Sequence, residues 1–219
     1  TNDAITVTVS DAISVSEFHT LNAKTGTAII LTGGMSDEAV NLADTSGTLS
    51  TDFSAATTQD SDVAVTITSG SGITDANAAQ ISAVAGITSG AVTASISGNY
   101  ATVNALTNTD TNDAITVTVS DAISVSEFNT LNAKTGADII LTGGITDEAT
   151  AFSSSSGVIE PGLEALSSQD SDVTLTVNDK VNMAQFSDID ASTSVSVVLT
   201  GGISDEALYL AYPSGTLTY

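Results

Sequence analysis

The chain repeats itself at an interval of 110 residues, and this repeat limits the possible fold more than any other feature. Residues 1–40 align without a gap with residues 111–150, and 34 of the 40 positions are identical. The segment 59–63 also returns unchanged at 169–173. Copies of one unit fold as an array in which each unit packs on its neighbours. We therefore divide the sequence into two super-repeats, residues 1–110 and 111–219, of one continuous structure.

The opening stretch of each super-repeat has the pattern of a strand followed by a short helix. Hydrophobic residues alternate with Thr and Ser over residues 5–10, which is the period of a strand with one buried face. Ser14 and Glu17 have the spacing of a capping box, in which each side chain bonds a backbone N–H at the start of a helix. The whole stretch 3–21 returns at 113–131.

Other segments carry similar signals for the start of a helix. Asn182 and Gln185 occupy the capping-box positions of a later segment. Thr74 is predicted to cap a helix with apolar residues at positions 78, 81 and 84. Three hydroxyl residues are also predicted as N-caps. Each comes shortly after a Gly-Gly pair and is followed directly by two acidic residues: Ser36, Thr146 and Ser204.

The spacing of these elements predicts a solenoid. Strands are expected to begin near residues 4, 28, 47, 63, 91, 114, 138, 157, 173, 195 and 216. This gives about five strand–helix coils in each super-repeat, or about 22 residues per coil. Same-direction strands joined by helices form a parallel sheet with right-handed crossovers, and the alternation with Thr and Ser predicts that one sheet face is in water. The predicted fold is therefore α/β, a right-handed α/β solenoid of about ten coils with a single-faced parallel sheet.

The charge of the chain excludes several kinds of partner. There are 3 Lys and Arg residues together against 26 acidic residues, and the formal net charge is −23. Nucleic acids and anionic membranes are bound through clusters of Lys and Arg, so neither is an expected partner. No apolar run approaches the ~20 residues that a membrane span needs, so we expect no membrane insertion. The chain begins at Thr1 and not at Met, which predicts a processed product or a part of something longer.

The blocks rich in Thr, Ala and Asp, such as residues 5–11 with 14–18, resemble a known kind of repeat. They are similar to the tandem-repeat regions of very large secreted and cell-surface proteins of marine bacteria and cyanobacteria. This resemblance implies an adhesin, a surface coat or a matrix protein, located outside the cell.

The sequence lacks the usual parts of an active site. Its single histidine, His19, is replaced by Asn129 in the otherwise nearly identical second copy, so we expect a solvent-exposed helix residue there. There is no Cys, and Lys and Arg together number 3, which leaves nucleophile–base pairs and phosphate clamps without their common components. We therefore predict that the protein is not an enzyme and has no catalytic residue.

Calcium is the cofactor that the residue pattern favours. Carboxylates two or three residues apart lie just before predicted strands, and hard cations prefer clustered oxygen ligands. The candidate ligands are Asp60, Asp62, Asp110, Asp113, Asp170 and Asp172. Neither an EF-hand loop nor a calcium-roll repeat is present. The alternative is that these residues cap turns and keep the surface soluble.

Pairs of threonines two residues apart form a second pattern, at residues 6 and 8, 66 and 68, 116 and 118, and 174 and 176. Regular Thr arrays on flat solenoid faces resemble those of ice-binding proteins. Ile30, Ile140 and Val198 are expected at outward positions of the intervening strands and would interrupt the array. The alternative is the ordinary preference of Thr for an exposed sheet face.

Both ends of the chain have strand patterns, which predicts open sheet edges. The residues expected at these edges are Ile5, Val7, Val9, Thr216, Leu217 and Tyr219. An open edge can pair with another chain, and a head-to-tail contact propagates into a fibre unless it closes into a ring. We therefore expect an extracellular structural repeat protein that stacks end to end with copies of itself or with neighbouring repeats of a longer chain, in a filament, surface layer or adhesin stalk. The alternative is a binding module, either a calcium-stabilised adhesin or an ice-binding protein.

Overall fold

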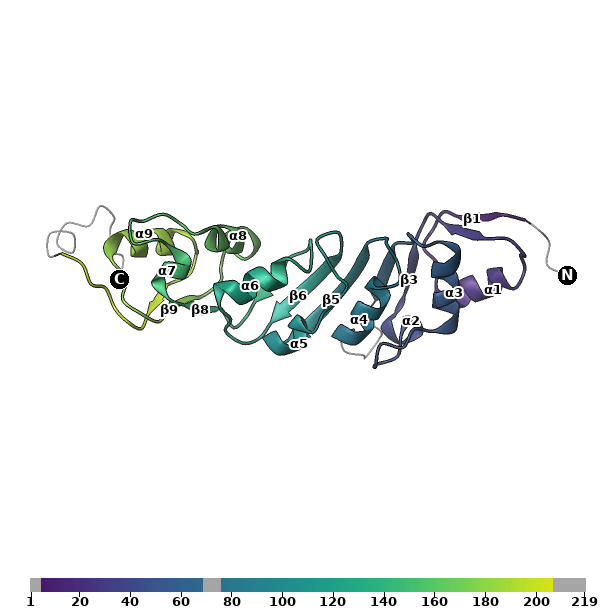
Figure 1. The fold of residues 1–219 in the computed structure, drawn as a ribbon, viewed down its shortest axis with the longest axis horizontal. Helices are drawn as coiled ribbons and strands as arrows, with labels where there is room; N and C mark the ends of the chain where they lie inside the picture. The colour runs from purple at the N-terminus through teal and green to yellow at the C-terminus, as the bar shows by residue number, and fades with distance from the viewer. Residues whose placement is uncertain (1–4, 69–75, 207–219) are drawn as a thin grey trace. The chain divides into compact units, whose positions relative to one another are not determined.

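The protein is an α/β protein with parallel sheets, in which strands and helices alternate along the chain (Figure 1). We describe a computed structural model, and the described residues are 5–68 and 76–206. The chain divides into two units. Unit 1 contains residues 1–97, 101–117 and 133–137, and unit 2 contains residues 98–100, 118–132 and 138–219. The division into super-repeats at residue 110 stays a prediction.

Unit 1 contains the first six strands and the first five helices of the described chain, apart from a few end residues of β5, β6 and α5. The strands are β1 (Val7–Val9), β2 (Ile29–Leu31), β3 (Met35–Glu38), β4 (Val65–Thr68), β5 (Val92–Gly98) and β6 (Ala114–Val119). The helices are α1 (Val15–Asn22), α2 (Ala39–Leu42), α3 (Thr51–Gln59), α4 (Ala78–Ala85) and α5 (Tyr100–Asn104). β1 and β2 form a parallel pair, and β3, β4, β5 and β6 are neighbours in that order in a second sheet.

Unit 2 has a three-stranded parallel sheet in the order β10-β9-β8. The strands of unit 2 are β7 (Ile139–Leu141), which is not part of this sheet, β8 (Ile145–Asp147), β9 (Leu175–Val177) and β10 (Val198–Leu199). Its helices are α6 (Val125–Asn132), α7 (Ala149–Phe152), α8 (Pro161–Gln169) and α9 (Met183–Ala191).

Alternate residues of β4 and β5 are buried, the pattern that a one-faced sheet requires of these strands. In β4, Val65 and Ile67 are buried, while Thr66 and Thr68 are exposed. The same alternation continues through β5. Because successive side chains of a strand point to opposite faces, one face packs on the core and the other meets water.

Aromatic side chains are few, but four of the five phenylalanines are fully buried. Phe18 of α1 and Phe53 of α3 lie in unit 1, where the two helices pack against each other. Phe128 of α6 and Phe152 of α7 are buried in unit 2. Each buried phenylalanine contributes about 1.5–3 kcal/mol through the hydrophobic effect, so a core otherwise made of Ile, Leu and Val is sufficient to hold the short helices in place.

Two predicted capping boxes are confirmed. Ser14 caps α1 together with Glu17, and Asn182 caps α9 together with Gln185. Backbone and side-chain hydrogen bonds from Ser14 hold the pKa of Glu17 below its usual value. The predicted cap of α4 was wrong. The cap is Asn77, because its Oδ1 accepts from the backbone N–H of Gln80, and the expected Thr74 lies outside the described residues.

Ser36 and Thr146 are not N-caps, contrary to the prediction. Each lies inside a strand, Ser36 in β3 and Thr146 in β8, and α2 and α7 begin three residues later with no side-chain cap. The backbone explains this result, because the Ser36 N–H is used in a ladder bond to the carbonyl of Ile13. Ser204 does not begin a helix within the described residues; its N–H bonds the carbonyl of Val181.

The strands expected near residues 47 and 157 are tight turns. Gly47 and Gly157 have φ of +85° and +75°, which a strand cannot contain. In the first turn, the Asp44 carboxylate accepts from the Ser46 hydroxyl and from the backbone N–H groups of Thr48 and Ser46. These bonds, the hydroxyl's first, lower the pKa of Asp44. A short polar side chain that bonds its own backbone competes with strand formation. The strand expected at residue 216 lies outside the described residues.

Candidate functional site

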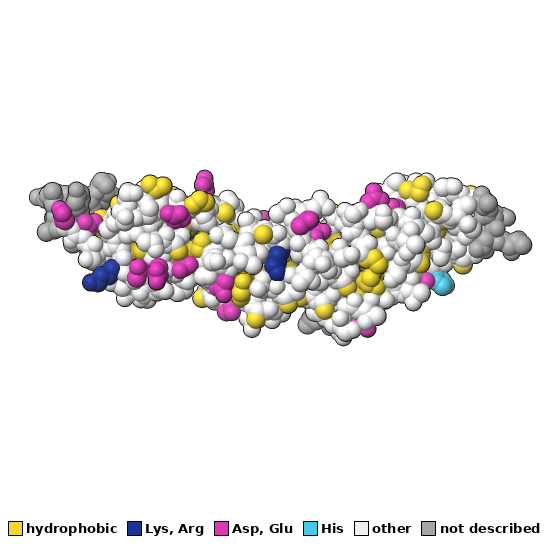
Figure 2. All heavy atoms as spheres, viewed as in Figure 1, with side chains coloured by type: hydrophobic (Ala, Val, Ile, Leu, Met, Phe, Trp, Pro, Cys, Tyr) yellow, Lys and Arg dark blue, Asp and Glu magenta, His cyan; other side chains and the backbone are white. Residues whose placement is uncertain are grey.

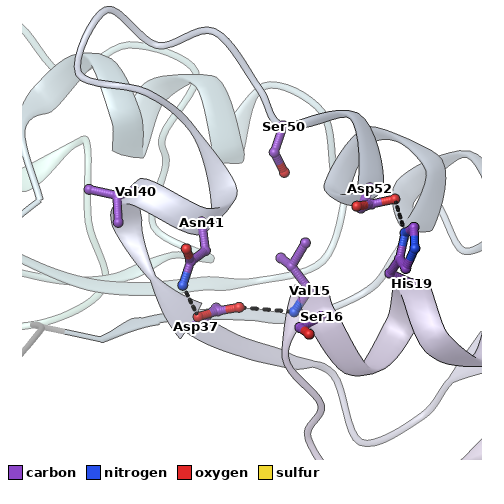
Figure 3. A pocket seen from close by; sticks show the side chains of 8 residues that line it. All are labelled: Val15, Ser16, His19, Asp37, Val40, Asn41, Ser50 and Asp52. Carbon is purple, nitrogen blue, oxygen red and sulfur yellow. Dashed lines mark hydrogen bonds and ion pairs between the residues drawn. The ribbon is translucent and has the colours of Figure 1, made fainter.

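Unit 1 has a surface hollow of about 510 Å³ between α1, β3, α2 and the start of α3 (Figure 3). It is lined by Val15, Ser16, His19, Asp37, Val40, Asn41, Ser50 and Asp52. All eight residues belong to one super-repeat of the sequence, so the hollow is a local feature of the first copy.

Asp37 holds three of these elements together. Its Oδ2 accepts from the backbone N–H of Val15 at 2.9 Å, which is one of the N–H groups left without an intrahelical partner at the start of α1. Its Oδ1 accepts from Asn41 Nδ2 at 2.7 Å and from the backbone N–H of Glu38 at 2.8 Å. Asp37 therefore fixes the floor of the hollow and has its oxygens occupied by protein donors.

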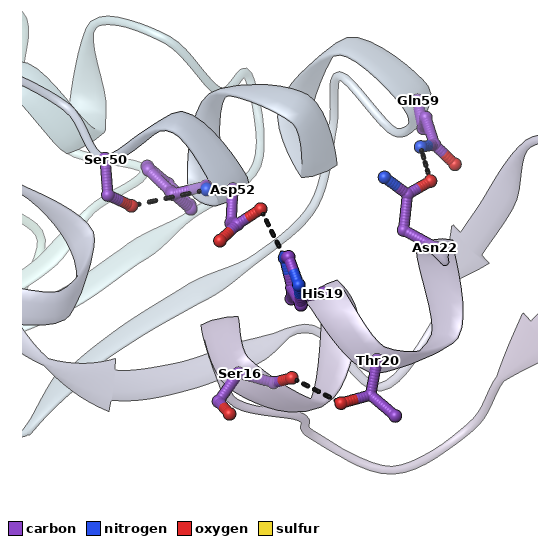
Figure 4. A network of polar contacts seen from close by, with 8 residues as sticks. Ser16, His19, Thr20, Asn22, Ser50, Asp52 and Gln59 are labelled. Atoms are coloured by element: carbon purple, nitrogen blue, oxygen red, sulfur yellow. Dashed lines mark hydrogen bonds and ion pairs between the residues drawn. The ribbon is translucent and has the colours of Figure 1, made fainter. Parts of the chain in front are cut away.

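His19 and Asp52 form an exposed pair on the rim of the hollow. His19 Nδ1 lies 2.9 Å from Asp52 Oδ1, and the two side chains are 66% and 41% exposed (Figure 4). A second polar contact joins the same helices, since Gln59 Nε2 donates to Asn22 Oδ1 at 2.8 Å. Among the described residues, Asp52 is the one polar group that contacts the imidazole. The pair therefore links α1 to α3 and orients the imidazole.

The second copy of the sequence replaces both members of this pair. Asn129 stands at the position of His19, and Gly162 stands at the position of Asp52. A Cβ atom on Gly162 would lie 2.5 Å from Val125 Cγ1 and 3.0 Å from Asn129 Nδ2. The other contact is retained, because Gln169 Nε2 donates to Asn132 Oδ1 at 3.2 Å. The helix-to-helix contact is thus common to both copies, whereas the His–Asp pair belongs to the first.

This difference predicts the effect of transferring one copy's residues to the other. The double substitution His19→Asn with Asp52→Gly is expected to change the free energy of unfolding by no more than about 1 kcal/mol, since exposed ion pairs contribute about 0–1 kcal/mol. Urea unfolding at neutral pH measures this change. Phe53→Ala on the same helix is the positive control, with an expected loss of about 3–5 kcal/mol. A loss from the double variant as large as that of the control would contradict this account.

The aspartates predicted to bind calcium have partners on the backbone. Asp60 Oδ2 accepts from the N–H of Leu31 at 2.5 Å, and Asp170 Oδ2 accepts from the N–H of Leu141 at 2.9 Å. Asp113 accepts twice, from the N–H of Val92 at 2.8 Å and from that of Asp110 at 3.1 Å. Each of these carboxylates therefore satisfies an N–H group of a neighbouring strand or turn.

The geometry does not gather these aspartates into a cluster. Within residues 5–68 and 76–206, no group of three or more His, Cys, Asp or Glu residues is arranged to hold a metal ion. Figure 2 shows carboxylates spread over the pictured face singly or in small groups. Asp62 and Asp172 are exposed, and Asp172 lies beside Asp170, whose pKa is raised first by burial and then by this neighbour. Calcium binding stays a prediction.

A second series of aspartates was missed by the sequence analysis. Asp147 Oδ2 accepts from the N–H of Val125 at 3.0 Å, and Asp205 Oδ2 accepts from the N–H of Met183 at 2.9 Å. Asp37 bonds Val15 in the same way, and all three pairs are 22 residues apart. The sequence does contain a signal for these aspartates. Each of them follows a Gly-Gly pair by three residues, and each follows a capping-box residue by about the length of one coil.

The residues predicted at the assembly edges are described only in part. Ile5 is 60% exposed, and Val7 and Val9 are half-buried in β1, whose one described pairing is to β2. Thr216, Leu217 and Tyr219 lie outside the described residues.

Comparison of the chain with protein-family models, with curated proteins and with solved structures found no match. Among the described helices, none has the length and apolar character that crossing a bilayer requires. The function must therefore be argued from the geometry alone.

Proposed function

We propose that the chain is a non-enzymatic structural repeat protein, secreted or displayed at a cell surface, whose segments form a right-handed α/β solenoid. In this proposal, copies of the chain, or neighbouring repeats of a longer chain, stack end to end into a filament, surface layer or adhesin stalk. Its role is mechanical, and its partners are protein segments of the same kind.

The observation that carries this proposal is the set of hydrogen bonds between consecutive segments. Three aspartates each bond the first helical N–H of the segment 22 residues before, which equals the coil length that the sequence predicts. Threonines make a second kind of link. Thr135 Oγ1 donates to the carbonyl of Ile115 at 2.7 Å, and Thr193 Oγ1 donates to the carbonyl of Val173 at 2.7 Å.

These links favour a structural role because each side chain joins one segment to the preceding one. Such nearest-neighbour bonding is what allows a solenoid to be extended segment by segment. The parallel pairing of β1 with β2 leaves the other side of β1 without a described strand partner, and strand edges pair with further chains. The net charge of −23 keeps such a chain soluble between contacts.

Negative-stain electron microscopy of the purified chain over a concentration series tests the proposal, with sedimentation in parallel. We expect rods that lengthen into filaments as concentration rises. Ile5→Lys, which places a charge beside the β1 edge, is expected to stop the lengthening, since lysine on an edge strand opposes pairing. Ile30→Lys is the matched control, because Ile30 is also exposed but lies on β2, whose N–H groups at Ile29 and Leu31 are already bonded by Gln59 and Asp60. Compact monomers at every concentration, or an equal effect of both variants, would contradict the proposal.

A further inference from the structure

The exposed face of the sheet formed by β3, β4, β5 and β6 in unit 1 carries aligned hydroxyl groups. Ser36, Thr66 and Thr93 are paired across β3, β4 and β5, so their side chains form one row. Thr68 and Ser95 stand two residues further along β4 and β5 and are exposed on the same face. We call the set Ser36, Thr66, Thr68, Thr93, Ser95 and Thr116, the last from β6, the hydroxyl face.

Most of this face is uncharged although the chain is strongly acidic. β4, β5 and the part of β6 in unit 1 contain no ionisable residue at any position. Glu38 of β3 is paired with Thr68, so it is the one acid among the strand residues of this face. One acid on four strands offers a cation no cluster of carboxylates, and the absence of Lys and Arg there leaves phosphates and nucleic acids without a cationic partner. Aromatic platforms for sugars are missing from it as well.

The hydroxyls of this face differ from other threonine hydroxyls in unit 1. Thr88 Oγ1 donates to the carbonyl of Val63 at 2.6 Å, and Thr135 Oγ1 is likewise held by backbone carbonyls. Within the described part of the chain, no protein group is a hydrogen-bond partner for the hydroxyls of Thr66, Thr68 or Thr93. These groups are therefore available to water, and the β-branched side chain restricts each to few rotamers.

The register fixes the spacing of these groups in two directions. Neighbouring strands lie about 4.8 Å apart, and side chains two residues apart on a strand are separated by about 6.6 Å. A grid of hydroxyl and methyl groups with these spacings can hold a sheet of water in fixed positions. Ile30 and Val198 do not interrupt it, since they belong to β2 and β10, which are in other sheets. Ile140 is on β7, which follows β6 at the end of the same sheet, so it lies beyond the grid and not inside it.

We propose that the hydroxyl face binds the surface of ice, an uncharged ligand whose oxygen atoms repeat in two dimensions. The free hydroxyls bond water molecules of the lattice, and the threonine methyl groups lie between them and exclude disordered water. This binding does not depend on end-to-end assembly, because the face lies within unit 1.

Thermal hysteresis of the purified chain, measured at millimolar concentration against an unrelated acidic protein, tests the inference. We expect hysteresis from the native chain and at least a five-fold loss on Thr66→Lys or Thr93→Lys, because each puts a charged chain in the middle of the grid. Thr20→Lys is the control. Thr20 is exposed on α1, away from the sheet face, and this variant is expected to retain the native value. Circular dichroism melting verifies that all variants are folded.

Each contrary result has a distinct meaning. Absence of hysteresis in the native chain overturns the inference, and so does native hysteresis in Thr66→Lys. An equal loss in Thr20→Lys also overturns it, because the effect would then come from charge alone. If sedimentation shows that the native chain self-associates and Thr66→Lys does not, while no variant gives hysteresis, the face is a protein contact and the inference fails.

Discussion

Replacing Gly143 by alanine is expected to lower the free energy of unfolding by more than about 3 kcal/mol, at the upper end of the effects of single substitutions. A Cβ atom at this position would lie 2.1 Å from the carbonyl carbon of Asp121 and 2.2 Å from its oxygen. These are backbone atoms, which cannot rotate away as a side chain can. The Gly143 N–H also bonds the carbonyl of Val119, so relief of the clash would break a strand contact.

Gly202→Ala is the matched control, because the two substitutions separate crowding from backbone strain. Gly202 is the second glycine of another Gly-Gly pair, with φ of +72° and no atom within 4 Å of the added Cβ. Gly202→Ala is therefore expected to lower the free energy of unfolding only through the left-handed backbone conformation, by about 1–2 kcal/mol. Chemical unfolding followed by circular dichroism measures both. If Gly143→Ala costs no more than Gly202→Ala, the close approach of the two segments is not as described.

The Gly-Gly pairs show why part of the fold was predictable from the sequence. A Gly-Gly pair is a local signal for a tight turn, and the second glycine of each pair has positive φ, +79° at Gly34 and +76° at Gly144. Local signals of this kind depend on a few neighbouring residues. The capping boxes at Ser14 and Asn182 and the alternation in β4 were recognised for the same reason.

Predictions failed where a local signal competed with a contact distant in sequence. Ser36 has the composition of an N-cap, but its N–H bonds the carbonyl of Ile13, which lies in a distant segment, and β3 also pairs with β4, about 30 residues later. The segment at residue 47 has the composition of a strand, but Asp44 bonds its N–H groups. The failure at Ser36 depends on strand pairing between segments that are too far apart to appear in one short stretch of sequence.

The candidate sites show the same division. The candidate calcium ligands were chosen because their carboxylates are close in sequence. Asp60 and Asp113, however, accept hydrogen bonds from backbone N–H groups 29 and 21 residues away. The hydroxyl face was recognised as a Thr pattern, but its continuity depends on which strands are neighbours. Neighbouring strands cannot be read from spacing alone, because the residues between them include turns of unequal length.

Asp113→Ala is expected to lower the free energy of unfolding by about 2–4 kcal/mol, since hydrogen bonds to a charged group contribute about 1.5–3 kcal/mol each and an unpaired buried donor is costly. Asp113 is 6% exposed and accepts from two backbone N–H groups, and one of them belongs to Val92, which is fully buried. Asp113→Asn keeps one acceptor oxygen and is expected to lose about half as much. Asp138→Ala is the control, because Asp138 is exposed and the first copy of the sequence has alanine there.

The same variants distinguish a structural aspartate from a calcium ligand, because the two roles respond differently to the metal. Melting temperatures are measured with excess calcium and with a chelator. If Asp113 only satisfies backbone donors, Asp113→Ala lowers the melting temperature by the same amount in both conditions. The melting temperature of Asp113→Asn then lies between those of Asp113→Ala and the native chain in each condition. If the carboxylate binds calcium, the metal raises the melting temperature of the native chain and of Asp138→Ala but not that of Asp113→Asn, since asparagine keeps an oxygen but loses the charge that holds a hard cation. The second result would show that Asp113 is a calcium ligand, as the sequence predicted, and does more than bond backbone N–H groups.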